Sequence, residues 1–172
     1  MVPRCARQWK AGGVVLGIAD AARLKDAYGR IFDNVRARQP DARIDGVLVQ
    51  KMERGLAEVI LGYRHDPLVG PMVIVGAGGT LAEIYKDYAI RSAPVDLAEA
   101  HRMITEVKAL AVVRGYRGLP PGDVDALAEA VVAFSMLALL PGETVGEAEI
   151  NPLLVKPAGE GVVAVDGLLV SR

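Results

Sequence analysis

The stretch from residue 147 to residue 166 constrains the fold more than any other part of the sequence, because it reads as a complete β-hairpin. Residues 147–156 and 161–166 are rich in apolar strand formers, and a turn of four residues separates them. If the residues that flank this turn pair with each other, the register of the whole ladder is fixed. Asn151 then lies directly opposite Asp166.

Acidic and amide side chains gather on one face of this hairpin. Glu147, Glu149 and Asn151 share a face because side chains alternate along a strand. Asn151 and Asp166, as a direct pair, would have Cβ atoms roughly 4.5–5.5 Å apart. Neighbouring carboxylates repel each other unless a cation lies between them, and Mg²⁺ takes such oxygens together with phosphates and water. The hairpin is therefore either a magnesium and phosphate site or a solvated edge hairpin, and this pattern leaves both open. The opposite face would carry Ile150, Leu154, Val163 and Val165.

Composition excludes several classes of protein. A chain of 172 residues with a formal net charge of −1 has no charge footprint for nucleic acid or a membrane surface. Its longest apolar run, residues 131–140, is too short to span a bilayer. Residues 1–13 contain no apolar core of a secretory signal. The single cysteine, Cys5, excludes a disulfide framework and fits the cytoplasm.

The aliphatic content is high for a chain of this length. The hydrophobic share is 52% and the mean hydropathy is +0.28, although only 5% of the residues are aromatic. Two explanations remain open. One is a core rich in alanine, valine and leucine, and the other is a partner lobe that covers part of the surface. The second explanation predicts self-association of the isolated chain, as a homo-oligomer.

The pattern of apolar residues and turns predicts the remaining elements. Strands are expected at residues 13–19, 45–52, 57–63, 72–75, 81–85 and 88–92, and helices at residues 20–40, 96–110 and 123–139. The turn at residues 53–55 predicts a hairpin between the second and third strands. Strands thus come in hairpins and helices in blocks, which indicates the α+β class. We expect a mainly antiparallel sheet covered by helices on one side, over residues 12–172, after an irregular segment at residues 1–11.

Two weaker signals point to a nucleotide. The glycine loop at residues 76–79 can offer backbone N–H groups to an anion. It is neither a Walker motif nor a dinucleotide fingerprint, since Leu81 stands where a third glycine would fall, and a plain turn explains it equally well. The strand end at residues 47–52 could bond an adenine edge, but an ordinary core strand has the same pattern.

Taken in order, several segments resemble the ATP-grasp domain of NDP-forming acyl-CoA synthetases. The relatives are ADP-forming acetate–CoA ligases and, more remotely, the β-subunit of succinyl-CoA synthetase. The segments that carry the resemblance are residues 12–18, 46–52, 58–62, 66–73, 76–83, 86–87, 91–94, 114–118 and 147–153. The resemblance covers nearly the whole chain from about Gly12 onward, and it corresponds to the C-terminal lobe of the ATP-grasp fold.

The resemblance implies ATP and Mg²⁺ as cofactors and assigns a role to each candidate residue. Asn151 and Asp166 would hold magnesium, with Glu149 close to the metal or to the transferred phosphoryl group. Three residues would line the docking site of a phosphohistidine from a partner CoA-binding domain: Gly78, Gly79 and Glu83. Four residues would lie beside adenine: Gln50, Lys51, Met52 and Glu58. Glu83 and Glu149 are the implied catalytic residues.

The implied reaction joins a carboxylic acid to CoA through an acyl phosphate and a phosphohistidine, and it converts ATP to ADP and phosphate. It needs a CoA-binding partner domain or subunit and an ATP-grasp N-terminal lobe, which this chain does not resemble. The chain alone is therefore expected not to turn over. An alternative is a non-catalytic nucleotide- or partner-binding module, as in protein acetyltransferases fused to such domains. A purely structural domain would leave the acidic face of the hairpin without a purpose.

Overall fold

The computed structural model describes residues 12–79, 86–141 and 145–171. Its contacts divide the chain into two compact units, Met1–Met52 and Glu53–Arg172, which are described separately. The predicted strand at residues 81–85 and the candidate Glu83 lie outside the described residues. Within the described part, no helix is both long and apolar enough to cross a membrane.

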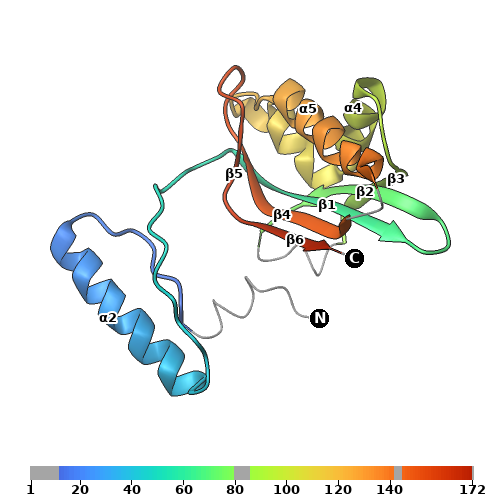
Figure 1. Ribbon diagram of the computed structural model, residues 1–172. Coiled ribbons are helices and arrows are strands. Elements are labelled where there is room, and N and C mark those ends of the chain that lie inside the picture. Colours follow the sequence, from blue (N-terminus) through green and yellow to red (C-terminus); the bar gives the residue numbers. More distant parts are fainter. Residues whose placement is uncertain (1–11, 80–85, 142–144, 172) are drawn as a thin grey trace. The chain divides into compact units, whose positions relative to one another are not determined.

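The first unit is built around helix α2, Ala21–Arg38 (Figure 1). Its buried residues, Ala27 and Ile31, are four positions apart, which is the spacing of residues on one face of a helix. The rings of Tyr28 and Phe32 lie beside each other, with centroids 4.7 Å apart. The Asn34 side-chain amide donates to the Gly12 carbonyl at 3.2 Å and thereby ties the preceding segment to the helix.

The strands predicted at residues 13–19 and 45–52 are not formed, and this part of the prediction is wrong. Both segments are apolar, but a strand exists only where its backbone groups find a neighbouring strand. Neither segment pairs with any described strand. Leu16, Leu48 and Val49 are consequently 57%, 79% and 63% exposed. The predicted hairpin between residues 45–52 and 57–63 is absent for the same reason.

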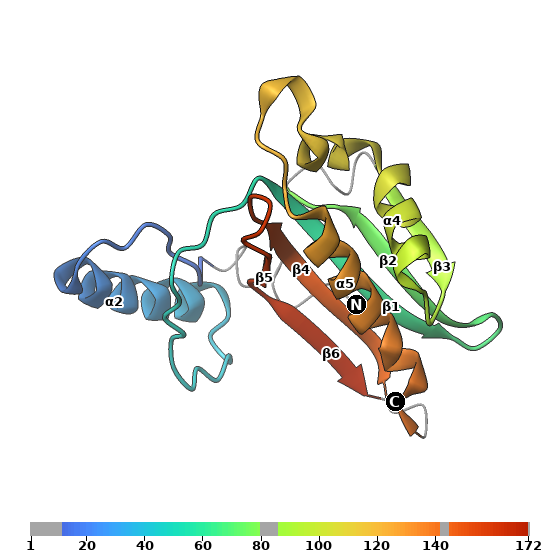
Figure 2. The same cartoon turned by 90° about the horizontal axis from the view of Figure 1, so that it is seen from above.

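The second unit is one six-stranded antiparallel sheet with helices on one face (Figures 1 and 2). The strands are β1 (Ala57–Asp66), β2 (Gly70–Ala77), β3 (Tyr88–Ser92), β4 (Val145–Val155), β5 (Val162–Ala164) and β6 (Gly167–Ser171). Their order is β3-β2-β1-β4-β5, and β6 continues beside β4. The expected α+β class with a mainly antiparallel sheet is confirmed. Strand β6 was not predicted, because residues 167–171 show no polar and apolar alternation.

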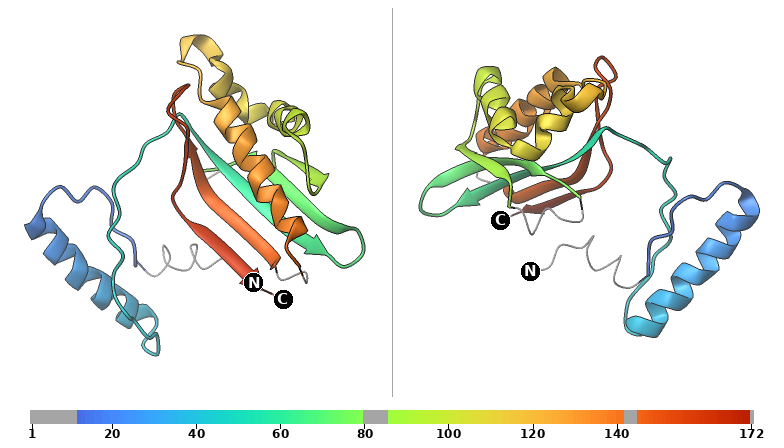
Figure 3. Two further views of the ribbon diagram at one scale, coloured as in Figure 1. Left: turned by 45° about the horizontal axis from the view of Figure 1, so that its top comes forward. Right: turned by 180° about the vertical axis from the view of Figure 1, so that it is seen from behind.

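The helices of this unit lie together over the sheet, as both views of Figure 3 show. They are α4 (Leu97–Glu106), η1 (Lys108–Arg114), η2 (Tyr116–Gly118), α5 (Val124–Ser135) and η3 (Met136–Leu139). The core between helices and sheet is aliphatic. Its fully buried members include Leu61, Val73, Val155, Met103, Ile104, Leu110, Leu127 and Val131. Each such side chain contributes roughly 1.5–3 kcal/mol when buried, so this layer fixes the sheet in place.

Aspartates begin the three described α-helices, as the sequence predicts for Asp20 and Asp96. Each carboxylate accepts an N–H of the first turn: Asp20 from Arg23 at 2.7 Å, Asp96 from Glu99 at 2.7 Å, and Asp123 from Ala126 at 3.0 Å. Such caps satisfy backbone donors that the helix itself leaves unpaired.

Asp123 also joins helix α5 to the turn of the β4–β5 hairpin. Its second oxygen, Oδ2, accepts the N–H groups of Gly159 and Gly161, both at 2.9 Å. The pKa of Asp123 is held below its usual value. The hydrogen bond from Ala126 contributes most, followed by those from Gly161 and Gly159. One carboxylate therefore holds both the helix start and the hairpin turn.

We expect Asp123→Ala to lower the thermal midpoint more than Asp96→Ala, whose carboxylate caps only one helix. A depressed carboxyl pKa contributes stability above the unfolded value of about 3.9, and that contribution disappears as pH falls through the folded value. The difference in stability between wild type and Asp123→Ala should therefore have its largest value near pH 7 and shrink below about pH 4. Thermal melts of the three proteins across pH measure it. Equal midpoints for the two variants at pH 7 would contradict the double role.

Candidate functional site

Strands β4 and β5 pair in the register that the sequence predicts. The Lys156 N–H donates to the Gly161 carbonyl at 3.1 Å, and the Asn151 N–H donates to the Asp166 carbonyl at 3.1 Å. The pairs between them are Leu153 with Ala164, Leu154 with Val163, and Val155 with Val162. The predicted placement of Asn151 opposite Asp166 is therefore confirmed.

A β-bulge lies at the same position on the other side of β4. Asn151 and Pro152 together lie opposite the single residue Ile60 of β1, because the flanking pairs shift by one. The flanking pairs are Val59 with Leu153 and Leu61 with Ile150. Past a bulge the alternation of faces changes. Ile150 and Leu154 consequently lie on opposite faces, and the expectation that they share one face is wrong.

The sheet face away from α4 and α5, called the open face below, carries the polar residues of the hairpin. The register places Glu149 across from Gly62 on this face, and Glu147 across from Arg64. The Asn151 side-chain amide donates to Glu149 Oε1 at 2.9 Å, so these two side chains lie together. Asp166 Oδ1 accepts the N–H of Gly167 at 2.8 Å. Among the described residues, one oxygen of each of these three side chains accepts no hydrogen bond, and such oxygens can coordinate a cation.

This donor set fits magnesium. Among the described residues no group of three or more His, Cys, Asp or Glu side chains is arranged to enclose a metal. An all-protein cage is therefore not what these residues provide. Mg²⁺ is typically held by one or two carboxylates and completes its shell with water and phosphate oxygens. Asn151 and Asp166, with Glu149 beside them, match that requirement.

The glycine turn after β2 lies against Glu58. The Gly78 N–H donates to the Glu58 carbonyl at 2.7 Å. A Cβ atom on Gly78 would lie 2.9 Å from the Glu58 carbonyl carbon and 3.0 Å from its oxygen, so only glycine fits there. Gly79 has a φ of 91°, and a Cβ there would lie 3.7 Å from Glu58 Oε2. The structure thus brings together Glu58, Gly78 and Gly79.

The other candidates are placed as follows. Gln50, Lys51 and Met52 are the last residues of the first unit, and their side chains are exposed. Glu58 belongs to the second unit, so a shared place of these four residues beside adenine stays a prediction.

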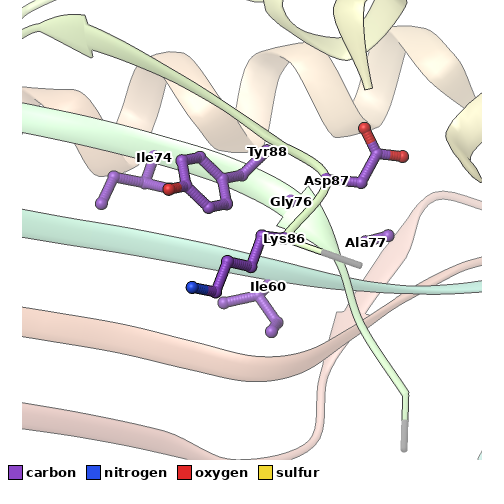
Figure 4. Close-up of a pocket in the computed structure, with 7 residues that line it drawn as sticks. All are labelled: Ile60, Ile74, Gly76, Ala77, Lys86, Asp87 and Tyr88. Atoms are coloured by element: carbon purple, nitrogen blue, oxygen red, sulfur yellow. The ribbon is translucent and has the colours of Figure 1, made fainter. Parts of the chain in front are cut away.

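A hollow of about 380 Å³ opens on the open face next to the bulge (Figure 4). It is lined by Ile60, Ile74, Gly76, Ala77, Lys86, Asp87 and Tyr88. Ile60 is also the residue opposite Asn151, so the hollow borders the candidate magnesium position. This hollow is not predictable from the sequence, because its walls come from three strands whose pairing no local pattern specifies. One part of the hollow could have been predicted, because alternation along β1 places Ile60 on the opposite sheet face from Val59 and Leu61.

Two polar residues near the hollow have structural tasks. Asp87 accepts the N–H groups of Lys108 at 3.1 Å and Ala109 at 2.7 Å, and so begins the helix η1. Arg91 pairs across from Val73, on the face covered by helices. There its guanidinium pairs with Glu99 at 2.5 Å and also with Glu106 of α4. Both carboxylate oxygens of Asp87 are thus engaged, and Arg91 lies on the helix-covered face.

Comparison with known proteins gives one consistent result. A family model described as an ATP-grasp domain matches residues 1–170. The chain is 42% identical over 161 residues to the ADP-forming acetate–CoA ligase I of Archaeoglobus fulgidus, which covers 94% of this chain and 23% of the relative. It is 35% identical over 172 residues to the β-subunit of ADP-forming acetate–CoA ligase II of Pyrococcus furiosus, which covers 100% of this chain and 73% of the subunit. The chain thus spans less than a quarter of the longer relative.

Solved structures of the dinucleotide-forming acetyl-coenzyme A synthetase 1 of Ca. Korarchaeum cryptofilum have the same fold. One, in complex with coenzyme A and Ca-AMPCP, matches with a TM-score of 0.88 and 33% identity over 95% of this chain and 70% of that chain. Another holds coenzyme A and Mg-AMPPCP, with a phosphohistidine segment that points towards the nucleotide-binding site. It matches with a TM-score of 0.82 and 29% identity over 100% of this chain and 74% of that chain.

Proposed function

Because the chain belongs to the ATP-grasp domain family, with ADP-forming acetate–CoA ligases among its relatives, we propose that it binds Mg-ATP on the open face of its sheet. It would serve as the nucleotide-binding part of an ADP-forming acyl-CoA synthetase, in the cytoplasm. The observation that carries this proposal is the pairing of Asn151 with Asp166, with Glu149 hydrogen-bonded to Asn151 at 2.9 Å.

The roles of the hairpin residues follow from this arrangement. Asn151 and Asp166 would hold magnesium through their side-chain oxygens. Bound magnesium would neutralise charge on the nucleotide phosphates, which is the main requirement of phosphoryl transfer. The hydrogen bond from Asn151 orients Glu149, whose carboxylate would lie close to the metal or to the transferred phosphoryl group. The bulge opposite Ile60 supports this role, since bulges are frequent beside active sites, where they redirect side chains.

The glycine turn would receive the group that exchanges phosphate with the nucleotide. Gly78 and Gly79 present a side-chain-free surface beside Glu58. We propose that a phosphohistidine on a CoA-binding partner domain or subunit docks there, with Glu83 as a further contact. A phosphohistidine segment that points towards the nucleotide-binding site in the related synthetase supports this proposal.

The first unit would supply the adenine side of the site. Gln50, Lys51 and Met52 would lie beside the base, with Glu58. The apolar segments at residues 13–19 and 45–52 make no strand pairing in the described structure, and their exposed side chains support a need for partner strands. We propose that an ATP-grasp N-terminal lobe, as a partner, supplies these strands. In its absence, a second copy of the chain could cover the same segments as a homo-oligomer.

Isothermal calorimetry tests the nucleotide site directly. The full chain should bind ATP in the presence of Mg²⁺ with a dissociation constant on the order of 1 mM or below, and more weakly after chelation of the metal. Adenosine with Mg²⁺ is the matched control, since it keeps the base but lacks the phosphates. An absence of magnesium-dependent ATP binding at millimolar concentrations would rule the proposal out.

A further inference from the structure

We propose that Lys86 binds the phosphate chain of the nucleotide on the open face, next to the magnesium position; this inference rests on the proposed function. Lys86 is a residue of the hollow beside the bulge. Figure 4 shows its side chain directed into that hollow, with the ammonium group on the side of Ile60. The ligand class that it would take is a nucleoside polyphosphate.

The position of the hollow supports a phosphate contact. Ile60 borders the hollow and also lies opposite Asn151 and Pro152 of the neighbouring strand. Neighbouring strands are about 4.7–4.9 Å apart. A phosphate chain coordinated to magnesium at Asn151 and Asp166 can therefore extend over Ile60 and come within reach of Lys86.

The Lys86 ammonium is not used by the fold. In the part of the chain that the structure describes, it makes no hydrogen bond and no ion pair. The carboxylate next to it in sequence, Asp87, is occupied by the N–H groups of Lys108 and Ala109. Glu58 and Glu149, which lie on the same sheet face, make no ion pair with it either. The positive charge is thus available to an anion.

The backbone at Lys86 is held in a costly conformation that aims this side chain. Its φ is 48°, in the left-handed region that residues other than glycine seldom adopt. The anchors are at Asp87, whose carboxylate holds the start of η1 and whose carbonyl accepts the Ala77 N–H at 3.1 Å. Strain of this kind is concentrated at ligand-binding positions, and persists where the surroundings enforce it.

The walls of the hollow strengthen the attraction. Ile60, Ile74 and the ring of Tyr88 are apolar, and Gly76 leaves the floor without a side chain. An ion pair against such a surface is less screened than one in open water. A lysine that only served solubility would need neither this position nor a left-handed backbone.

Calorimetry on four proteins tests the inference: the wild-type chain and the variants Lys86→Met, Lys86→Arg and Lys108→Met. Methionine keeps an unbranched apolar stem and removes the charge, and exposed Lys108 on η1 is the matched control. We expect Lys86→Met to weaken Mg-ATP binding about tenfold, with a smaller loss for Mg-AMP. Lys86→Arg and Lys108→Met should stay within about threefold of wild type. Thermal melts confirm that each variant is folded.

Each outcome decides between the two proposals. Mg-ATP affinity that is unchanged in Lys86→Met but lost in Asn151→Ala would overturn the role of Lys86 and leave the proposed function intact. An equal loss in Lys86→Met and Lys108→Met would show a general charge effect and would also overturn it. A wild-type chain that binds no Mg-ATP would overturn both.

Discussion

Asn151→Ala should abolish magnesium-dependent ATP binding by this chain. The substitution removes the amide oxygen opposite Asp166 and the hydrogen bond that orients Glu149 at 2.9 Å. Loss of a residue that only supports a metal ligand typically costs 10–100-fold in affinity, so loss of a ligand should cost more than about 100-fold. Asp166→Ala should have the same effect. Titration of Mg²⁺ into the chain with ATP present, followed by calorimetry, measures both.

Glu147→Gln is the matched control for these variants. Glu147 lies on the same sheet face as Glu149, across from Arg64, but it is exposed, and the side chain hydrogen-bonded to Asn151 is that of Glu149. Its charge is screened by water, so its removal should change the affinity less than about threefold. If Glu147→Gln weakened binding as much as Asn151→Ala, overall negative charge and not coordination would explain the effect. Wild-type affinity in Asn151→Ala would exclude the hairpin as the magnesium site.

Gly78→Ala should destabilise the second unit. The new Cβ atom would lie 2.9 Å from the carbonyl carbon of Glu58 and 3.0 Å from its oxygen, both of them backbone atoms of β1. Strand β1 pairs with β2 on one side and β4 on the other, so it cannot move aside without breaking ladder bonds. We expect the free energy of unfolding to fall by roughly 1–3 kcal/mol. Urea denaturation measures this change.

Gly62→Ala, in strand β1 itself, provides the comparison. A Cβ atom on Gly62 would lie 3.6 Å from the Ile74 Cβ, which is an ordinary contact, and the φ of Gly62 is not positive. Its free energy of unfolding should change by less than about 0.5 kcal/mol. Similar losses in both variants would mean that any added methyl group weakens β1. No loss in Gly78→Ala would mean that the glycine turn can shift without cost.

The register of the terminal hairpin could be predicted because it depends on local information. The turn length and the position of the flanking residues fix every rung, and the observed pairs agree. The bulge at Asn151 and Pro152 could not be predicted, because it arises between β4 and β1, which are far apart in sequence. The wrong assignment of Leu154 to the face of Ile150 is a direct consequence.

In the first unit, the apolar pattern of the sequence does not lead to the predicted strands. Residues 13–19 and 45–52 have the composition of strands, but the pattern reflects a tendency towards burial and says nothing about which strand is the partner. Without a described partner the backbone pairing is absent, and Leu48 is 79% exposed.

The hollow beside the bulge also could not be predicted from the sequence. Ile60, Ile74 and Tyr88 belong to three different strands, and each alone has the pattern of a sheet residue. Only the register brings them together. The left-handed backbone of Lys86 has no signature in the sequence either, since glycine or asparagine would be expected at such a position.

The central claim is that the hairpin from Glu149 to Asp166 holds the metal of a metal–nucleotide complex. Mn²⁺ can replace Mg²⁺ in such oxygen sites, and its unpaired electrons broaden the nuclear resonance signals of nearby amides. With ATP present, substoichiometric Mn²⁺ should first broaden the amide signals of residues 149–151 and 166, and adenosine in place of ATP should weaken this effect. If these signals stay sharp while others broaden, the metal is bound elsewhere and the proposed site is wrong.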